Sequence, residues 1–280
     1  MKLRWLGTAG HVVEAAGTTL LLDPFLTRPS PLTTLGRPLE PTPDAWWRWL
    51  PERVDAILVG HSHYDHLMDA PVIAKRTGAT IVGSASTAAF ARAAGVPEDR
   101  IAIVPPEGRE LAFGDVRVRF VPSLHGRIFA GKVPFPGTVD APPRLPARLW
   151  EYRMGGAFGV HVTAGATRIY HNGSADLVDA ELEDVGADVL LVGLAGRRAT
   201  PDYLARLLRL LAPTLLVPTH HDAFFAPLES GMRLLPGVDF DGFVADAARL
   251  APEARVVTPG YEDVLVVPEG GAKDAVLAHL

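Results

Sequence analysis

The sequence predicts an α/β fold, and three observations indicate it. Short apolar runs with strand character alternate with helical segments along most of the 280 residues. The first three runs, KLRWL, HVVEA and TTLLL, are separated by glycines, as in a β-meander. Clusters of histidine and aspartate follow several strands, and α/β proteins usually place their sites on loops at strand ends.

The elements after the meander begin with a Pro-rich stretch at 29–43. It leads into the short helix PDAWWRWL, in which Thr42 can act as N-cap and Pro43 occupies the first turn. Two or three of its tryptophans are expected to pack against the sheet rather than bind a ligand. VDAILVG at 54–60 is almost continuously apolar, so it predicts a buried strand that runs directly into HSHYDH at 61–66.

The rest of the chain continues the alternation. Further helices are expected at 69–77, in STAAFARAAG, at 176–184, in PDYLARLLRLL and at 239–250; further strands are expected in ATIVG, IAIV, DVRVRFVPS, ADVLLVG and TLLVP and in the tail. GAFGVHVTAG and TRIYHNG predict a hairpin that turns at Ala164-Gly165. Residues 127–150 carry five prolines and are interpreted as a loop insertion in a single domain that spans 1–280.

The composition of the chain limits the classes of function and the kinds of metal site that we expect. Apolar residues make up 48% of the chain and the formal net charge is -5, with basic residues scattered rather than clustered. No basic face is indicated, so we expect no nucleic-acid partner. Neither a signal peptide nor a membrane-spanning run is found, so a cytoplasmic location is expected. The chain has no cysteine, so a metal ion must be held by histidine and carboxylate.

HSHYDH places four potential metal ligands within six residues. His61 and His63 are two positions apart, so an extended or turning backbone can point both imidazoles the same way. Asp65 and His66 come at the turn into a helix and are expected to point toward a second position. Two positions about 3.5–4 Å apart are the usual geometry of a two-metal hydrolase, in which a coordinated water is activated for attack.

These motifs resemble those of the metallo-β-lactamase superfamily. The resemblance runs from WLGTAG to THHDAFF and is greatest to small hydrolases related to ascorbate-6-phosphate lactonases and N-acylphosphatidylethanolamine-type phosphodiesterases. It implies a four-layer αβ/βα sandwich of two packed mixed β-sheets with helices on the outer faces. It also places Asp23, in LLLDPFL, next to the site.

The resemblance implies a ligand set when its motifs are carried over position by position. One metal would be held by His61, His63 and His125, and the other by Asp65, His66 and His220. Zinc is the first expectation, with manganese or iron as alternatives, because histidine and carboxylate suit all three. Asp65 is also expected to orient the attacking water or to accept its proton.

YHNGSADL at 170–177 departs from the family pattern. Related proteins commonly have Gly-Asp here, and that aspartate bridges the two metals, whereas Gly173 is followed by Ser174. Three alternatives stay open: Asp176 reaches the metals through a shifted loop, Ser174 or water fills the gap, or only one metal is held tightly. A bridging carboxylate offsets the repulsion between two dications, so its loss is expected to weaken the second site.

Further residues near the motifs are candidates for supporting roles. His171 is expected to hold a ligand imidazole in its tautomer or to face the substrate as a catalytic proton donor. His221 and Asp222 are candidates for contacts to a ligand imidazole. The other three histidines, His11, His161 and His279, are expected to be ordinary residues.

The insertion follows His125 directly, so it is placed to cover the site. An apolar wall is expected from Phe129, Val133, Phe135 and Trp150. An anionic group could pair with Arg127, Lys132, Arg144, Arg148, Arg197 or Arg198. Solvated surface charges, or a dimer contact for the insertion, are the alternatives.

The sequence therefore predicts a metal-dependent hydrolase that uses one or two divalent ions. Its substrate would be an ester, lactone, amide or phosphodiester of a small molecule, with a preference for an anionic one. The rivals are a nuclease of the same fold and a protein that has lost catalysis and binds a ligand. Ser174 keeps the second rival open, and the oligomeric state stays open as well.

Overall fold

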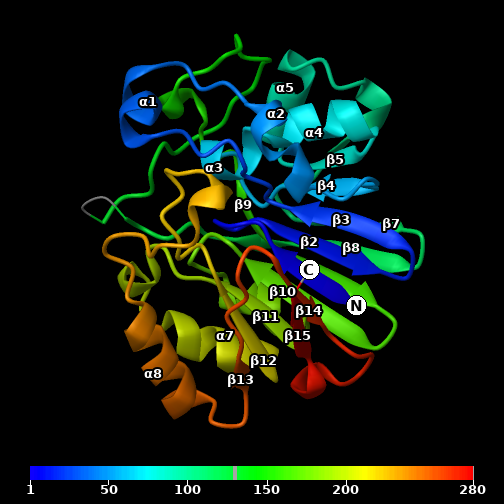
Figure 1. Cartoon of the computed structure of the whole chain (residues 1–280), viewed down its shortest axis with the longest axis vertical. Helices are drawn as coiled ribbons and strands as arrows, with labels where there is room; N and C mark the ends of the chain where they lie inside the picture. Colours follow the sequence, from blue (N-terminus) through cyan, green and yellow to red (C-terminus); the bar gives the residue numbers. More distant parts are fainter. Residues whose placement is uncertain (129–130, 280) are drawn as a thin grey trace.

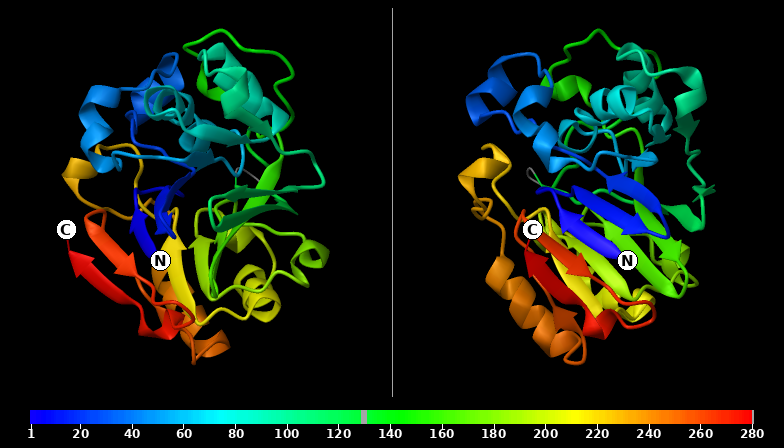
Figure 2. Two further views of the ribbon diagram at one scale, coloured as in Figure 1. Left: turned by 90° about the vertical axis from the view of Figure 1, so that its right-hand side faces the viewer. Right: turned by 45° about the vertical axis from the view of Figure 1, so that its right-hand side comes forward.

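A computed structural model of the chain describes residues 1–128 and 131–279. Its strands form two mixed sheets, one of eight strands in the order β15-β14-β1-β2-β3-β4-β5-β6 and one of seven in the order β13-β12-β11-β10-β9-β8-β7. Figures 1 and 2 show the helices at the two ends of the molecule, with the sheets between them.

Both sheets combine antiparallel and parallel pairs. The first sheet contains β1 (Lys2–Trp5), β2 (His11–Ala15), β3 (Thr18–Leu22), β4 (Ala56–Leu58), β5 (Thr80–Gly83), β6 (Ile101–Ile103), β14 (Asp263–Val266) and β15 (Val276–His279). The second contains β7 (Arg109–Phe113), β8 (Val116–Ser123), β9 (Ala157–Ala164), β10 (Thr167–Asn172), β11 (Val189–Gly193), β12 (Leu215–Thr219) and β13 (Arg255–Val256). Pairing is parallel from β3 to β6 and from β10 to β13.

Eight α-helices accompany the sheets in the described residues. They are α1 (Pro31–Gly36), α2 (Pro43–Trp46), α3 (Tyr64–Leu67), α4 (Ala70–Thr77), α5 (Ala85–Ala93), α6 (Asp179–Leu182), α7 (Tyr203–Leu211) and α8 (Phe240–Leu250). Short 3₁₀ turns lie between them, including η1 (Trp47–Trp49), η3 (Leu149–Glu151) and η4 (Arg197–Ala199). No helix of the described chain is long and apolar enough to cross a membrane.

Three apolar cores separate the four layers. Strands alternate their side chains between two faces, so Leu20 and Leu22 of β3 pack between the sheets while Leu21 packs under the helices. The inner core joins side chains of both sheets, such as Leu58 of β4 and Val160 of β9. The predicted four-layer sandwich of two mixed sheets with helices outside is confirmed.

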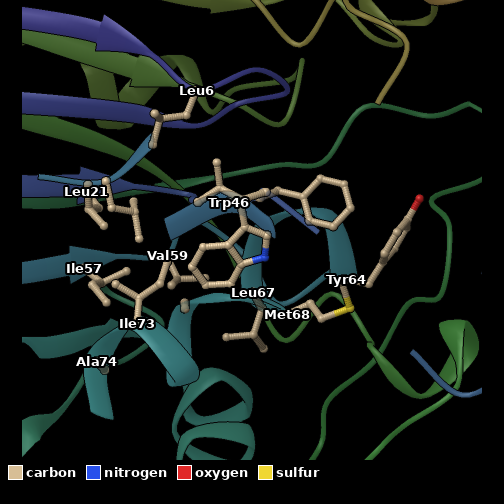
Figure 3. Close-up of a cluster of buried hydrophobic side chains, with 14 of the residues drawn as sticks. Leu6, Leu21, Trp46, Ile57, Val59, Tyr64, Leu67, Met68, Ile73 and Ala74 are labelled. Atoms are coloured by element: carbon tan, nitrogen blue, oxygen red, sulfur yellow. The ribbon is translucent and has the colours of Figure 1, made fainter. Parts of the chain in front are cut away.

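Trp46 lies in the core between the first sheet and its helices. It is 2% exposed, and Figure 3 shows its indole ring among side chains such as Val59, which directly follows β4, and Leu67 of α3. Trp49 is also buried and Trp47 partly so, which confirms that these tryptophans pack rather than bind a ligand. This packing seats α3, the helix that carries two of the predicted ligands.

Most predicted elements are present, with a few corrections. The helix expected at 176–184 is reduced to α6, because Ala175 is in the left-handed region and pairs in an isolated bridge with His125. The helix α1 and the strand β7 were not expected. The described residues of the insertion, up to η3, contain no helix or strand of the two sheets, as its prolines indicate.

The predicted clustering of site residues at strand ends is confirmed. Asp23 directly follows β3, and HSHYDH follows β4 by two residues. On the second sheet, His125 follows β8, and His220 directly follows β12. The strands that carry these loops end at the same edge of the sandwich, so four segments far apart in sequence meet there.

Asp69 fixes the loop that leaves the site after β3. Its fully buried carboxylate accepts hydrogen bonds from the backbone N–H groups of Leu26 at 2.6 Å and Thr27 at 2.8 Å, and from the Thr27 hydroxyl. Burial raises the pKa of Asp69 from 3.8 to about 6, although these hydrogen bonds oppose the shift. The folded protein therefore binds this proton more tightly than the unfolded chain does.

This shift predicts a pH-dependent difference between wild type and Asp69→Asn. The free energy of unfolding of wild type should fall relative to the variant as the pH rises from about 4 to about 6, by about 3 kcal/mol, and the difference should be constant above that range. Urea unfolding at several pH values measures it. A difference that does not vary over this range would contradict the prediction.

Candidate metal centre

Three histidines form the first group of potential ligands. His61 and His63 come from the loop after β4 and His125 from the loop after β8. Each offers one ring nitrogen, and these three nitrogens lie within 4.8 Å of one another. The ring centroid of His61 lies 4.7 Å from that of His63 and 4.7 Å from that of His125. Such an arrangement can hold one divalent ion.

The partners of these rings indicate which nitrogen is left for a metal. Nε2 of His63 lies 2.9 Å from the carbonyl oxygen of Pro134, so it carries the proton and leaves Nδ1 free. Nδ1 of His125 lies 2.8 Å from the carbonyl oxygen of Gly126, which leaves Nε2 free. Nε2 of His61 is buried and has no hydrogen-bond partner among the described residues. An orphaned buried nitrogen of this kind fits a metal ligand.

The second group is formed by Asp65, His66 and His220. Their ligand atoms also lie within 4.8 Å of one another. Oδ2 of Asp65 is 3.2 Å from Nε2 of His220 and 3.8 Å from Nε2 of His66. The rings of His61 and His66 are 3.8 Å apart, so the two groups are adjacent. The structure therefore brings six of the seven predicted ligands together as the two expected sets.

Asp23 orients the second group from behind. Its Oδ2 lies 2.9 Å from Nδ1 of His66, and its Oδ1 accepts a hydrogen bond of 2.6 Å from the backbone N–H of Gly60. The carboxylate is fully buried, so it fixes the ring of His66 with Nε2 directed at Asp65. This placement agrees with the expectation that Asp23 lies next to the site.

The pKa values of the first group suit metal binding. Burial lowers the pKa of His63 to about 4 and that of His125 to about 3, and it lowers the pKa of His61 well below 6.5. All three imidazoles are thus neutral at neutral pH. A neutral imidazole is the form that binds a metal ion, so no proton has to be displaced from this group.

The second group has the opposite electrostatics. Burial by itself would raise the pKa of Asp65, but His66 and His220 hold it well below its ordinary value. Burial would lower the pKa of His66, but the carboxylates of Asp23 and Asp65 outweigh it and raise this pKa above 6.5. The carboxylates of Asp23 and Asp65 therefore concentrate negative charge around His66. A cation bound at this group would also neutralise that charge.

The loop that carries His220 is fastened to the loop after β1. His220 has a φ of 53°, a conformation that non-glycine residues rarely adopt. Its N–H donates to the carbonyl of Thr8 at 2.7 Å, and the hydroxyl of Thr219 donates to the same carbonyl at 2.7 Å. Asp222 accepts a 2.8 Å hydrogen bond from the N–H of Thr8. The peptide of Thr8 thus holds His220 in its strained conformation.

Asp222 is the centre of a buried ionic cluster. Its Oδ2 pairs with the guanidinium of Arg28 and accepts a hydrogen bond of 2.7 Å from the hydroxyl of Tyr261. Asp222 does not contact a ligand imidazole, so its expected role is corrected to that of an anchor for the loop. No local motif predicts the contacts of Asp222 with Thr8, Arg28 and Tyr261, because these residues lie 39 to 214 positions from it.

His171 lies behind the site rather than in contact with a substrate. It is 1% exposed, its Nδ1 is 3.8 Å from Oδ2 of Asp23, and it does not line the cavity described below. Burial lowers its pKa to about 4, so it is neutral at neutral pH. These observations do not support the predicted catalytic proton donor. His221 stacks on Trp5 with ring centroids 4.6 Å apart, which is a packing role.

The segment 173–176 does not supply a carboxylate to either group. The carboxylate of Asp176 accepts a hydrogen bond from the N–H of Leu177 at 2.8 Å and lies 3.9 Å from Nη1 of Arg206. The expected ligand role of Asp176 is therefore not supported, because its side chain turns toward α7. Ser174 lines the cavity, but its hydroxyl donates to the carbonyl of Leu124 at 2.9 Å.

A cavity of about 700 Å³ opens above both groups. Its floor includes five of the six grouped ligands, His63, Asp65, His66, His125 and His220. Its walls come from α1, from the loop after β8, from η4 and from residues 224–239. The size suits a small organic molecule.

The structure places only some of the residues expected to meet the substrate at the cavity. The cavity is lined by Phe135, Arg127, Arg197 and Arg198 but not by Val133, Lys132, Arg144, Arg148 or Trp150. Trp150 is 49% exposed and lies under the guanidinium of Arg148. Phe129 lies outside the described residues. The cavity is also lined by Phe224, Phe225 and Leu35, which were not expected from the sequence, although THHDAFF places the two phenylalanines close to His220.

Comparison with known proteins shows the family of the chain. The family described as "Beta-lactamase superfamily domain" matches residues 2–220. A UPF0173 metal-dependent hydrolase of Carboxydothermus hydrogenoformans is 32% identical over 231 residues, covering 80% of this chain and 86% of the relative. One of Anaeromyxobacter dehalogenans is 33% identical over 231 residues, covering 80% of this chain and 75% of the relative.

Solved structures share the fold at low sequence identity. Igni18, a metallo hydrolase of Ignicoccus hospitalis, superposes with a TM-score of 0.58 at 19% identity and covers 100% of this chain and 98% of its own. An isothiocyanate hydrolase from Delia radicum gut bacteria superposes with a TM-score of 0.59 at 18% identity and covers 95% and 99%. At these identities, the likeness shows a shared fold and nothing about activity.

The anchoring of His220 predicts an effect of Tyr261→Phe on metal binding. Loss of this hydroxyl removes a hydrogen bond to a buried carboxylate and loosens the loop that holds His220. We expect zinc affinity at the second group to fall by about tenfold or less, with the first group unchanged. Titration against a competing chromophoric chelator measures both steps. Tyr152→Phe, a buried tyrosine on Phe90 outside the centre, is the control; equal weakening at both groups would contradict the prediction.

Proposed function

Because the chain belongs to the β-lactamase superfamily, as a metal-dependent hydrolase of the UPF0173 family, we propose that it uses two adjacent divalent ions to hydrolyse one bond of its substrate. The bond would be an ester, lactone, amide or phosphodiester of a small anionic molecule. The observation that carries this proposal is the pair of three-ligand groups at the floor of one cavity, with the rings of His61 and His66 3.8 Å apart.

The donor set fits zinc. Each group offers three side-chain ligands, all imidazole or carboxylate, and leaves room on the cavity side for water or substrate. Manganese and iron accept the same donors and remain alternatives. Ions bound here would act as Lewis acids, lowering the pKa of water toward 7 and stabilising negative charge that develops on the substrate.

The side chains of the cavity floor can carry out the proton transfers. Asp65 is ionised, and its carboxylate lies at the floor, where it can orient water and accept a proton. Tyr64 also lines the cavity, and Figure 3 shows its hydroxyl pointing away from the apolar core. Burial raises the pKa of Tyr64 above its ordinary value, so the hydroxyl keeps its proton and can donate a hydrogen bond to the substrate. The geometry favours Tyr64 over His171 for this role.

Ser174 bears on how tightly the second ion is held. It lines the cavity next to the loop of His125 and carries no charge, so nothing at this position offsets the repulsion between two dications. The second group, in which the charge of His66 depends on Asp23 and Asp65, is therefore proposed to bind its ion more weakly than the first. The finer resemblance to lactonases and phosphodiesterases remains a prediction about substrate.

Metal content tests the two-ion proposal. Wild type should bind two zinc ions with unequal affinity, and Ser174→Asp should tighten the weaker step by about tenfold because it adds a carboxylate to the cavity wall. Asp176→Ala should leave both steps unchanged, since its carboxylate faces Arg206. Elemental analysis and chelator competition measure these values. A single ion in both wild type and Ser174→Asp would reject the second position.

Ligand substitutions test hydrolysis itself. His61→Ala and His220→Ala should each lower kcat/KM for a p-nitrophenyl ester or for bis(p-nitrophenyl) phosphate by about a hundredfold or more, because each removes a ligand of one group. His279→Ala, at an imidazole exposed on β15, is the matched control and should retain full activity. Chelation should abolish activity and added zinc should restore it. Undiminished turnover in both ligand variants would refute the metal mechanism.

A further inference from the structure

The residues that line the cavity indicate a chemical class of substrate, in addition to the class of reaction. The geometry points to an amphiphilic anion as the substrate. This inference rests on the proposed function. An apolar acyl chain or aryl ring would lie beside the scissile bond, and a carboxylate, sulfate or phosphate away from that bond would pair with Arg127 and Arg198.

Aromatic rings flank the two metal groups directly. The ring of Phe135 lies 6.4 Å from that of His63, and the ring of Phe224 lies 5.3 Å from that of His220. Both phenylalanines line the cavity, as does Phe225, which packs on Phe224. A substrate group next to the scissile bond would therefore meet phenyl rings on both sides, and these favour an apolar chain or aryl ring over a sugar.

The mouth of the cavity extends this apolar surface. Leu35 of α1 is 68% exposed and Ile128 is 43% exposed, and both line the cavity. Large apolar side chains held in water at the mouth of a cavity are stabilised when a ligand covers them. Leu35 projects from a helix of fewer than two turns that begins with a capping Ser30, so its place at the mouth is set by backbone structure.

Two arginines, Arg127 and Arg198, add positive charge to the otherwise apolar wall of the cavity. Arg127 follows the ligand His125 by two residues, and Arg198 belongs to η4. The loops that carry them touch, because a Cβ atom at Gly196 would lie 2.9 Å from Cγ2 of Ile128. Both residues line the cavity and are exposed, and their guanidinium groups have no acidic partner within the described part of the chain. They are available for an anion.

Arg197 shows by contrast what a structural arginine looks like here. Its Nη2 pairs with Asp239 at 2.9 Å and its Nη1 with Asp246 at 3.0 Å, so its charge is already balanced. The other carboxylate at the cavity, Asp65, belongs to the second metal group. Among the described residues that line the cavity, Arg127 and Arg198 therefore carry positive charge that no carboxylate balances. They lie in the same cavity as the apolar side chains of Leu35 and Ile128.

Binding to the metal-free protein tests the two halves of this inference separately. Octyl phosphate should bind at least about tenfold more tightly than inorganic phosphate, which lacks the chain, and than octyl glucoside, which lacks the charge. The double variant R127Q/R198Q should lose that advantage over octyl glucoside, whereas Leu35→Ser should weaken both octyl ligands. Isothermal titration measures the Kd values, and Arg148→Gln is the control outside the cavity.

The binding results can overturn the inference. If octyl phosphate binds R127Q/R198Q as tightly as it binds wild type, the histidine groups hold the phosphate and the arginines do not. If inorganic phosphate binds as tightly as octyl phosphate, the cavity does not recognise the chain. Either outcome rejects the amphiphilic anion, and neither concerns the metal mechanism.

Turnover by the zinc-loaded enzyme separates this inference from the proposed function. The p-nitrophenyl half-ester of suberic acid, an eight-carbon chain with a terminal carboxylate, should have a kcat/KM at least about tenfold above those of p-nitrophenyl octanoate and acetate. R127Q/R198Q should lose the preference for the half-ester over the octanoate. Equal, zinc-dependent turnover of all three esters would leave hydrolysis standing and reject the amphiphilic anion. Failure to cleave any ester or bis(p-nitrophenyl) phosphate would count against the proposed function, while the binding test would still decide the inference.

Discussion

The buried carboxylate of Asp23 is the contact on which the metal centre depends. It follows β3 and accepts a hydrogen bond from Gly60, which follows the neighbouring parallel strand β4, and it also fixes the ring of His66. One side chain therefore joins two strand ends and orients a ligand. A buried charge is stable only when fully partnered, so this carboxylate also requires its neighbours to keep their positions.

The second half of the centre is held by contacts between loops of different sheets. Thr8, from the first sheet, binds the backbone of His220 and the carboxylate of Asp222, from the second. Pro134, from the insertion, accepts from the ring of His63 and so selects the nitrogen that faces a metal. Each ligand set thus combines side chains of both sheets, and the site exists only when the sandwich has closed.

The two ligand groups share a cavity but differ in charge, and this difference shapes the chemistry. The first group is three neutral imidazoles, while the second combines an ionised Asp65 with a His66 whose pKa is raised. The resemblance led us to expect a bridging carboxylate after Gly173, and the residue at that position is Ser174. Apolar side chains around the floor, such as Phe135 and Phe224, lower the local polarity and so strengthen the electrostatic contacts there.

Local pattern alone determined the α/β alternation, the place of the ligands at strand ends and the density of ligands in HSHYDH, because these are properties of neighbouring residues. The resemblance added the four-layer sandwich and the assignment of His125 and His220. Asp176 could not be placed from the sequence, because whether a carboxylate two positions after Ser174 turns toward the two ligand groups or toward Arg206 depends on the bridge between Ala175 and His125. Tertiary structure alone decided that Arg28 and Tyr261 contact Asp222 and that His171 lies behind Asp23, away from the cavity. It also decided that Arg127 and Arg198 have no acidic partner among the described residues, whereas Arg197 has two. Side-chain direction and partnership are set by residues distant in sequence, which no local pattern encodes.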